Sequence, residues 1–245
     1  TLTQHDEAIQ KQAVAGRAGV ARILPAHFHY VRAAAGAGAG QAIEGEDDPA
    51  VAQLGGVEVN GAPQHVVQVD VGLAAVDYAK LLGARVIAAS ASDAKLATIA
   101  AEYAVDATVN VTGGFRERIK AITGGKGADV IYDPVGGDVF DESIRCVAFG
   151  GRILSIGFTS GRLPVLPVNI ALIKGFSVHG VRAGEYGRQN PAKGAENNEA
   201  IWKLAEAGKV KPRVDAEYPL SEWREAFETL AQRKVVGKTV IRPDL

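Results

Sequence analysis

From His65 onward, short apolar runs alternate with amphipathic segments along the chain. The apolar runs predict strands at His65–Asp70, Arg85–Ala89, Ala107–Val111, Asp129–Tyr132 and Arg152–Ile156. The segments between them predict helices at Gly72–Gly83, Asp93–Tyr103, Phe115–Ile122 and Val139–Phe149. Continuous apolar strands separated by helices are typical of a parallel sheet covered on both faces. The sequence therefore predicts an α/β fold with a doubly wound parallel sheet.

The same rhythm continues beyond Gly157. It predicts a short helix at Asn169–Lys174, a strand at Phe176–Val181, a polar loop at Tyr186–Asn198 and a helix at Glu199–Ala207. Ser221 is an expected N-cap for a helix in which Trp223, Ala226, Phe227 and Leu230 recur on one face. The last predicted strand is Val235–Ile241.

Residues 1–64 do not follow this alternation. They include the low-complexity run Ala33–Gly40, which cannot pack a specific core. A helix is predicted only at Asp6–Val14. His27 and His29 could face one side of a strand as metal ligands, but an H-x-H pair without a third ligand is more often incidental. We expect a truncated or degenerate segment here.

Composition excludes several classes of protein. The 27 basic and 28 acidic residues give a net charge of −1, which draws the chain to neither nucleic acid nor a membrane surface, and no apolar run reaches the roughly 20 residues of a membrane span. The single cysteine, Cys146, rules out an internal disulfide and a cysteine-rich zinc site, and is consistent with a cytoplasmic protein. Because Met is absent, we expect a partial or processed sequence.

Four segments in order resemble one protein family. They are GLAAVDYAKLLGARVIA, GADVIYDPVGGDVF, RCVAFGGRILSIGF and RKVVGKTVI, and together they span roughly residues 72–241. These segments resemble the zinc-independent quinone oxidoreductases of the medium-chain dehydrogenase/reductase superfamily. The resemblance implies a Rossmann nucleotide-binding domain over residues 65–220, and a carboxy-terminal helix and strand over residues 221–245 that return towards a first domain. Residues 1–64 would be an atypical remnant of that substrate-side domain, too short to hold it all.

The turn that should hold the cofactor's pyrophosphate departs from the family pattern. The family has Gly-Gly-Val-Gly where this chain has Val69-Asp70-Val71-Gly72, so only Val71 and Gly72 match. Close approach of backbone to phosphate needs glycine, and Asp70 adds a negative charge. At about 4 Å and an effective dielectric near 20, like charges repel by roughly 4 kcal/mol before screening, about a thousandfold in affinity. Alternatively, Asp70 N-caps the helix.

The end of the second strand favours NADPH over NADH. A carboxylate at this position would accept the ribose 2′-hydroxyl of NAD, but the run here is ASASDAK and the strand end carries none. Ser90, Ser92 and Lys95 suit a 2′-phosphate instead. Ordinary capping by Ser92 beside a solvated Lys95 is the alternative, and Asp93 is a rival that comes late for the acidic position.

Further cofactor-binding residues are implied by the resemblance. Asp133, Pro134, Val135 and Gly136 follow the fourth strand, where ligands gather in such sheets; a plain strand-to-helix turn, with Asp138 or Asp141 at the helix start, explains them equally. Gly157 would face the nicotinamide amide and Phe158 would flank its ring or simply pack in the core. Lys238, and with less support Arg233, match basic positions near the cofactor or are solvated.

These residues predict an NADPH-dependent oxidoreductase that transfers a hydride to a quinone or related α,β-unsaturated carbonyl. No catalytic acid or base is required, because solvent supplies protons and the reaction needs alignment in a dry cleft. His179 and Cys146 are expected to be structural. An inactive Rossmann remnant serving as a dimeric binding module, and an enoyl-thioester reductase, are the alternatives. The strand at Phe176–Val181 is an expected sheet edge, through which the resemblance implies a homodimer.

Overall fold

The computed structural model describes residues 72–210 and 212–243 together with the backbone of residues 64–68. The predicted helix at Asp6–Val14, the histidines at 27 and 29, and residues 69–71 of the pyrophosphate turn lie outside the described residues.

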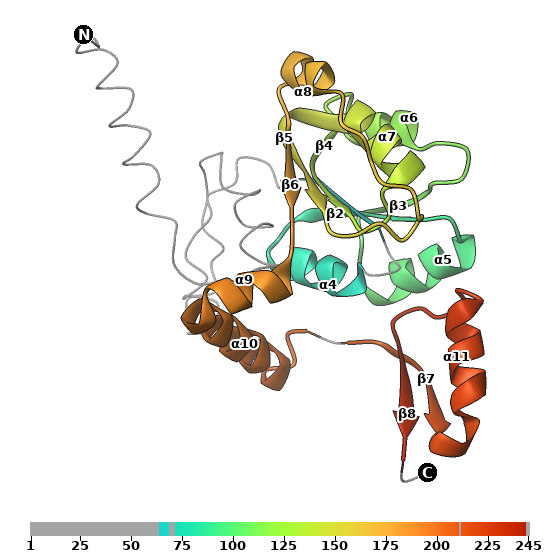
Figure 1. Cartoon of the computed structure of the whole chain (residues 1–245). Coiled ribbons are helices and arrows are strands. Elements are labelled where there is room, and N and C mark those ends of the chain that lie inside the picture. Colours follow the sequence, from blue (N-terminus) through green and yellow to red (C-terminus); the bar gives the residue numbers. More distant parts are fainter. Residues whose placement is uncertain (1–63, 69–71, 211, 244–245) are drawn as a thin grey trace.

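A six-stranded parallel sheet forms the body of the protein (Figure 1). Its strand order is β3-β2-β1-β4-β5-β6. The strands are β1 (Gln64–Gln68), β2 (Arg85–Ser90), β3 (Ala107–Asn110), β4 (Ala128–Asp133), β5 (Val147–Ser155) and β6 (Ser177–Gly180). This is the doubly wound order in which the chain starts at the centre and winds outward in both directions. The predicted fold class is confirmed, and β6 is an edge strand of this sheet as expected.

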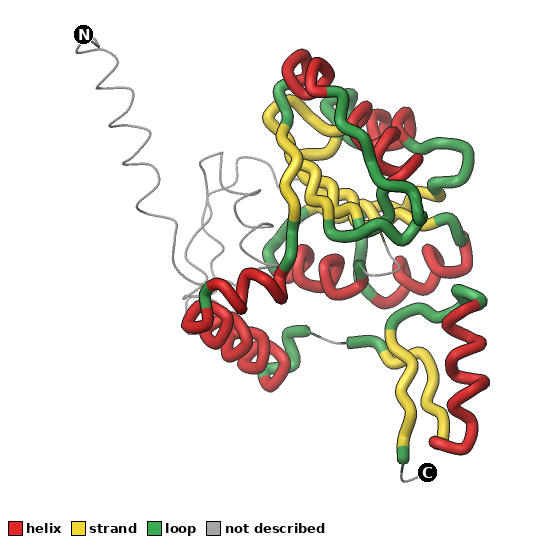
Figure 2. Tube along the Cα trace, viewed as in Figure 1, coloured by secondary structure: helices red, strands yellow, loops and turns green. Residues whose placement is uncertain are grey.

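Helices cover both faces of the sheet, and Figure 2 shows the two layers on either side of the strands. On one face lie α6 (Arg116–Ile122), α7 (Gly137–Cys146) and α8 (Val168–Lys174), and on the other lie α4 (Leu73–Leu81) and α5 (Asp93–Glu102). The first layer buries Phe140 and Ile144 against Ile131 of β4, and the second buries Val76 and Ala79 against Val130, also of β4. Successive residues of β4 therefore serve opposite faces, as a strand's two-residue period requires.

The connection between α6 and β4 requires a glycine at position 127. Gly127 has a φ of +87°, and a Cβ at this position would collide with the carbonyl oxygen of Cys146. Only glycine combines a left-handed backbone with such a close approach. The contact fixes the start of β4 against the start of β5, where the register between the two strands shifts.

Two helices after the sheet differ from the sequence-based expectation. The predicted loop at 186–198 is wrong, because α9 (Ala183–Gln189) and α10 (Pro191–Glu206) cover it. Pro191 sits at the first turn of α10, where its missing N–H costs nothing. Gly187 and Gly194 let the helices touch, since a Cβ on Gly194 would lie 3.1 Å from the Cα of Gly187.

A second, two-stranded parallel sheet follows, made of β7 (Val214–Pro219) and β8 (Lys238–Arg242) and joined through the 3-10 turn η1 (Leu220–Glu222) and α11 (Trp223–Ala231). We call this part the carboxy-terminal unit. It includes β7, so it extends further back than the predicted boundary at 221. The predicted N-cap at Ser221 is wrong, because Ser221 lies inside the 3-10 turn and α11 begins at Trp223.

Candidate functional site at the carboxyl ends of the strands

The strand order reverses between β1 and β4, and ligands of doubly wound sheets bind in the crevice outside the strand ends at that point. Gly72 begins α4 after β1, Ser90 ends β2 and Asp133 ends β4. These predicted residues thus lie at the carboxyl ends of three neighbouring strands. We call this side of the sheet the carboxyl edge.

The turn after β4 is closed by its own aspartate. The Asp133 carboxylate is 1% exposed, and its Oδ1 accepts the backbone N–H groups of Val135 at 2.8 Å and Gly136 at 2.9 Å. Burial raises the pKa of Asp133 despite the opposing effect of these two hydrogen bonds. Asp133 therefore fixes the shape of the turn.

The segment after β5 runs alongside that turn and hydrogen-bonds to it. The N–H of Ile156 donates to the carbonyl of Asp133 at 2.9 Å, that of Thr159 to Pro134 at 3.2 Å and that of Ser160 to Val135 at 3.1 Å. A Cβ on Gly157 would lie 3.3 Å from the Pro134 carbonyl oxygen. The structure thus brings together six predicted site residues: Asp133, Pro134, Val135, Gly136, Gly157 and Phe158.

The glycines of this turn are required by the protein's own loop. Gly136 and Gly137 have φ values of +69° and +54°. A Cβ on Gly136 would lie 3.2 Å from the Phe158 ring, and one on Gly137 would lie 2.7 Å from the Ser160 hydroxyl. Close packing of the loop against the start of α7 therefore accounts for both glycines without a cofactor. The Phe158 ring stays 46% exposed, so it is not a core residue.

Arg162 fastens the same loop to α7. Its guanidinium pairs with Asp138 at 2.8 Å and with Asp141 at 2.6 Å. The two aspartates stand near the start of the helix as the sequence predicted, and they also anchor the loop. Sequence reasoning missed Ser160 and Arg162, because nothing local links residues 21 to 24 positions apart.

The other half of the carboxyl edge is the turn between β2 and α5. The Ser92 hydroxyl oxygen accepts the N–H of Lys95 at 3.4 Å and caps α5, which confirms the capping interpretation. The Ser90 hydroxyl oxygen accepts the N–H of Ser92 at 3.2 Å. Both oxygens act as acceptors in these bonds, which do not use the hydrogen of either hydroxyl. Lys95 is 8% exposed, so the expectation of a solvated lysine is wrong.

Asp93, the alternative acidic residue at this edge, is hydrogen-bonded to the neighbouring strand β3. The carboxylate of Asp93 accepts a hydrogen bond from the amide of Asn110, at the end of β3, at 2.6 Å. The first residue of α5 is therefore used to join the ends of two strands. No described carboxylate ends β2 itself, where a ribose-binding acid would stand.

The start of α4 is described from Gly72 onward. Gly72 is buried at the N-cap position and no acidic residue occupies the first turn of the helix. Backbone N–H groups at such a helix start favour an anion. Val71, and the alternative in which Asp70 caps the helix, lie outside the described residues.

Lys238 and Arg233 lie in the carboxy-terminal unit. The N–H of Lys238, in β8, donates to the carbonyl of Arg213, whose side chain pairs with Glu102. Glu102 ends α5, whereas Ser92 precedes its first residue. A helix of 10 residues separates the two positions by about 15 Å. Arg233 is exposed, in the turn after α11.

Side chains that the sequence analysis left out of the chemistry are structural. Burial raises the pKa of the Cys146 thiol to about 12, which confirms an inert core cysteine. The pKa of His179 is lowered by partial burial and by the charge of Arg152, and its ring hydrogen-bonds to Ser177 at 2.9 Å. Cys146 ends α7, away from the carboxyl edge, whereas His179 lies one residue before the end of β6, in register with Leu154 of β5.

Two kinds of feature are absent from the part of the chain that is described. It contains no group of three or more His, Cys, Asp or Glu side chains placed to hold a metal ion. The described side chains therefore do not fit a zinc site, which needs three or four such ligands. None of the described helices combines the length and the apolarity needed to cross a membrane.

A six-stranded parallel sheet with this strand order and with helices on both faces defines a Rossmann-type domain. Residues 71–197 match the family described as zinc-binding dehydrogenase. The chain belongs to this family and is a quinone oxidoreductase-like protein of the medium-chain dehydrogenase/reductase superfamily.

Individual relatives share this part of the chain. The quinone oxidoreductase-like protein 2 homolog of Nematostella vectensis is 39% identical over 173 residues, covering 69% of this chain and 47% of the relative. The quinone oxidoreductase of Pseudomonas aeruginosa is 32% identical over 184 residues, covering 73% and 55%. The crystal structure of Escherichia coli quinone oxidoreductase complexed with NADPH superposes with a TM-score of 0.66 at 29% identity, covering 76% of this chain and 59% of that one. The chain therefore spans about half the length of the curated relatives it matches.

Proposed function

We propose that this chain is an NADPH-dependent reductase, which transfers a hydride to a quinone or a related α,β-unsaturated carbonyl. The observation that carries the proposal is the end of β2, where two serine hydroxyls with donatable hydrogens stand in place of a carboxylate. A structural relative described as complexed with NADPH supports the choice of cofactor, and relatives described as quinone oxidoreductases support the acceptor. The proposed reaction is zinc-independent.

Each part of the carboxyl edge has a proposed task. Ser90, Ser92 and Lys95 would hold the 2′-phosphate, and the start of α4, from Val71 and Gly72, would face the pyrophosphate. Asp133 would act indirectly by fixing the turn that carries Pro134, Val135 and Gly136. Gly157 and the exposed ring of Phe158 would position the nicotinamide.

When bound, the nicotinamide supplies the hydride, and the chain's own residues orient it and keep water away. Because an electron-poor quinone accepts the hydride directly and solvent provides protons, the described residues need to supply no acid or base. Lys238, and with less support Arg233, would lie near the cofactor, as the resemblance implies. A cytoplasmic location stays a prediction.

Calorimetric titration of the full chain with NADPH and with NADH tests the cofactor. We expect micromolar binding of NADPH and binding of NADH at least about tenfold weaker, a difference of about 1.4 kcal/mol. No heat with either cofactor, on a chain whose circular dichroism shows it folded, would overturn the proposal. That outcome would favour the second candidate, an inactive Rossmann remnant, to which Val69 and Asp70 in the pyrophosphate turn already point.

Substitutions in the turn separate charge from bulk. Asp70→Asn removes only the charge, whereas Val69→Gly combined with Asp70→Gly restores the family's two glycines. If repulsion dominates, both variants gain NADPH affinity, by up to about a thousandfold before screening is considered. Asp77→Asn is the matched control, because it removes one negative charge further along α4. A control that gains as much as Asp70→Asn would contradict a local effect.

We also propose a homodimer formed through the exposed edge of β6. Unpaired strand edges favour pairing with another chain. Phe149 of β5, the strand next to β6, and Val168 and Leu172 of α8, the helix before β6, are 86%, 75% and 81% exposed. Apolar side chains gathered beside an open edge are typical of an interface. Light scattering after gel filtration should report a dimer for the wild type and a monomer for Ser177→Lys, in which a charge blunts the edge.

A further inference from the structure

A separate cavity of about 490 Å³ lies between α6, α7 and α8. Its lining includes Ile144 and Arg145, which adjoin the last residue of α7, whereas the carboxyl edge adjoins the first residue, Gly137. The helix is 10 residues long and so separates the two places by about 15 Å. We call this cavity the basic pocket, and it takes no part in the proposed hydride transfer.

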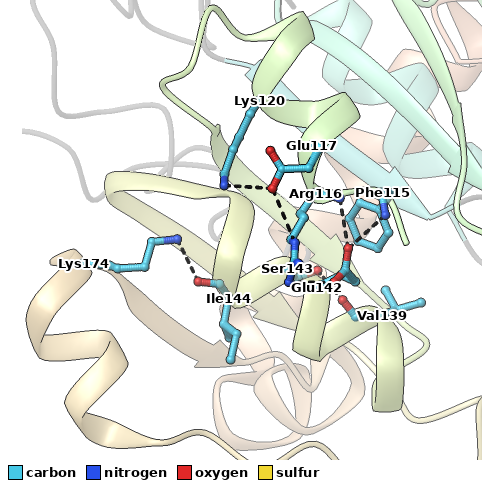
Figure 3. A network of polar contacts seen from close by, with 9 residues as sticks. All are labelled: Phe115, Arg116, Glu117, Lys120, Val139, Glu142, Ser143, Ile144 and Lys174. Atoms are coloured by element: carbon cyan, nitrogen blue, oxygen red, sulfur yellow. Dashed lines mark hydrogen bonds and ion pairs between the residues drawn. The ribbon is translucent and has the colours of Figure 1, made fainter. Parts of the chain in front are cut away.

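Positive charge dominates the lining of the basic pocket. Arg116, Lys120, Arg145 and Lys174 face a single acidic residue, Glu117. Glu117 is shared, since its Oε1 lies 3.2 Å from the Lys120 ammonium and 3.4 Å from Arg116 (Figure 3). Four cations against one carboxylate leave an excess of three positive charges.

A second carboxylate near the pocket, that of Glu142, already bonds to residues of the protein. Glu142 of α7 accepts the N–H groups of Phe115 and Arg116 at 3.0 and 3.1 Å with one oxygen, and lies 3.5 Å from the Arg116 guanidinium with the other. It caps the start of α6 from the neighbouring helix. Counting Glu142 still leaves the cations in excess.

Lys174 is held in place over the end of α7. Its ammonium donates to the carbonyl of Ile144 at 2.8 Å (Figure 3), and its side chain lines the same pocket as Lys120. Within residues 72–210 and 212–243, neither Lys174 nor Arg145 has a carboxylate partner. Partial burial lowers the pKa of Lys174, and the charges of Lys120 and Arg145 lower it further. An anion in the pocket would relieve this repulsion.

The rest of the lining is apolar. Ile144 is 4% exposed, Ile170 is half-buried and Ile173 is 76% exposed. A bare inorganic anion would satisfy the cations but leave Ile173 in water. A ligand that joins an anionic group to a hydrocarbon part would contact both, and the cavity lies within the range of small-molecule sites, about 300 to 1,000 Å³.

We propose that the basic pocket binds a small amphiphilic anion, an alkyl chain that carries a phosphate or carboxylate group. The four cations hold the anionic group, and Ile144, Ile170 and Ile173 hold the alkyl chain. The nucleotide is expected at the other end of α7, so the two ligands bind independently.

Calorimetric titration of the full chain with monomeric hexyl phosphate tests the proposal, with inorganic phosphate and hexanol as half-ligand probes. We expect saturable binding of hexyl phosphate, binding of inorganic phosphate at least about tenfold weaker, and no heat with hexanol. Preloading with NADPH should leave hexyl phosphate affinity unchanged. Displacement by NADPH would overturn the proposal, because it would place the anion at the carboxyl edge.

Substitutions locate the site. Arg145→Gln and Lys174→Gln should each weaken hexyl phosphate about fivefold, and together by about 25-fold if the effects add. Arg145 is exposed and has no described bond to lose, so its variant tests the site even where Lys174→Gln disturbs α7. The matched control is Lys203→Gln with Arg224→Gln, which removes the same charge from α10 and α11.

Equal affinity of the double variant and the wild type would overturn the proposal. So would inorganic phosphate binding as tightly as hexyl phosphate, because the isoleucines would then contribute nothing. Sedimentation with phosphatidylglycerol vesicles, without saturable binding of monomeric hexyl phosphate, would replace the pocket by a membrane surface.

Discussion

The two parallel sheets of this protein are built from the same strand-helix-strand connection but differ in what covers their helices. In the six-stranded sheet, Phe140 of α7 is 2% exposed. In the carboxy-terminal unit, Trp223 and Phe227 of α11 are 42% and 57% exposed, and only Ala226 of that helix is buried. Parallel sheets are stable when both faces are covered. The large sheet meets this condition by itself, and the small one does not.

The position of the carboxy-terminal unit therefore depends on few contacts. Val236 packs against Leu96 and Ile99 of α5, and Arg213 pairs with Glu102 at 2.9 Å. Arg213 also bonds to Asp215 and to the carbonyl of Val236. Secondary structure in the unit is thus regular, while the described contacts that attach it to the main body centre on Val236 and Arg213.

The largest expected effect separates the two regions directly. Phe140→Ala should lower the free energy of unfolding by about 3 to 5 kcal/mol, because it empties a buried site in the large sheet. Phe227→Ala is the matched control on α11 and should cost less than about 1 kcal/mol, mainly through its edge contact with Trp223. Urea denaturation measures both. Equal losses would mean that α11 is covered in solution.

A smaller loss of stability should follow from removing the ion pair between the two regions. Arg213→Gln removes the pairing with Glu102, and we expect a loss of about 1 to 2 kcal/mol, since this side chain is only partly exposed. Tryptic cleavage after Lys209 should accelerate because the unit is less firmly attached. Arg224→Gln, which removes an exposed charge over Trp223, serves as the control and should leave the cleavage rate unchanged.

Within the large sheet, Asp106 gives a pH-dependent contribution. Its Oδ2 accepts the N–H of Val86 at 2.7 Å and the Lys80 ammonium at 2.9 Å. Burial opposes ionisation, but these bonds lower the pKa of Asp106 below 3.8 on balance. The lowered pKa contributes stability above pH 3.8 that is lost as the pH falls through the folded-state value. Asp106→Asn should cost about 1 kcal/mol at pH 7 and less at pH 3; a loss that is the same at both would contradict this sign.

The smallest expected effect has the opposite sign and concerns the carboxyl edge. Burial raises the pKa of Asp133, so the folded protein binds this proton more tightly than the unfolded chain does. The free energy of unfolding therefore falls as the pH rises through the raised value. Asp133→Asn keeps an acceptor for Val135 and Gly136. We therefore expect the stability of Asp133→Asn relative to the wild type to rise between pH 3.5 and pH 7, in urea denaturation at both values. A constant difference would show that Asp133 keeps its ordinary pKa.

The periodicity of apolar residues was sufficient to predict the large sheet because each of its strands and helices has a recognisable local sequence pattern. Strands such as Arg85–Ser90 are continuous apolar runs, and α5 begins at a serine that caps it. The predicted helix at 139–149 ended too late, because Val147–Phe149 is apolar in either structure and is recruited into β5 by pairing with β4. The helix predicted at 199–207 is present as the second half of α10, but the helical residues before it, 183–198, were missed because charged pairs such as Lys193–Glu196, and not an apolar stripe, occupy their exposed faces.

The candidate site was predictable only where neighbours in the sequence are neighbours in space. Asp133 and the glycines after it form one local turn, which the run Asp-Pro-Val-Gly indicates by its turn chemistry. The loop at 156–164 reaches that turn through backbone hydrogen bonds, which leave no mark on residue types. The role of Lys238 stays a prediction, since its strand belongs to a second sheet whose position no local pattern reveals.

Cys146 gives this protein an intrinsic reporter of its own opening. It is the single cysteine of the chain, it is 1% exposed, and its thiol has a pKa of about 12. Since the thiolate is the reactive form, an alkylating reagent can modify it only in molecules where α7 has come away from the sheet. The rate of alkylation under native conditions therefore measures how often the core opens, with no label to introduce and no residue to change.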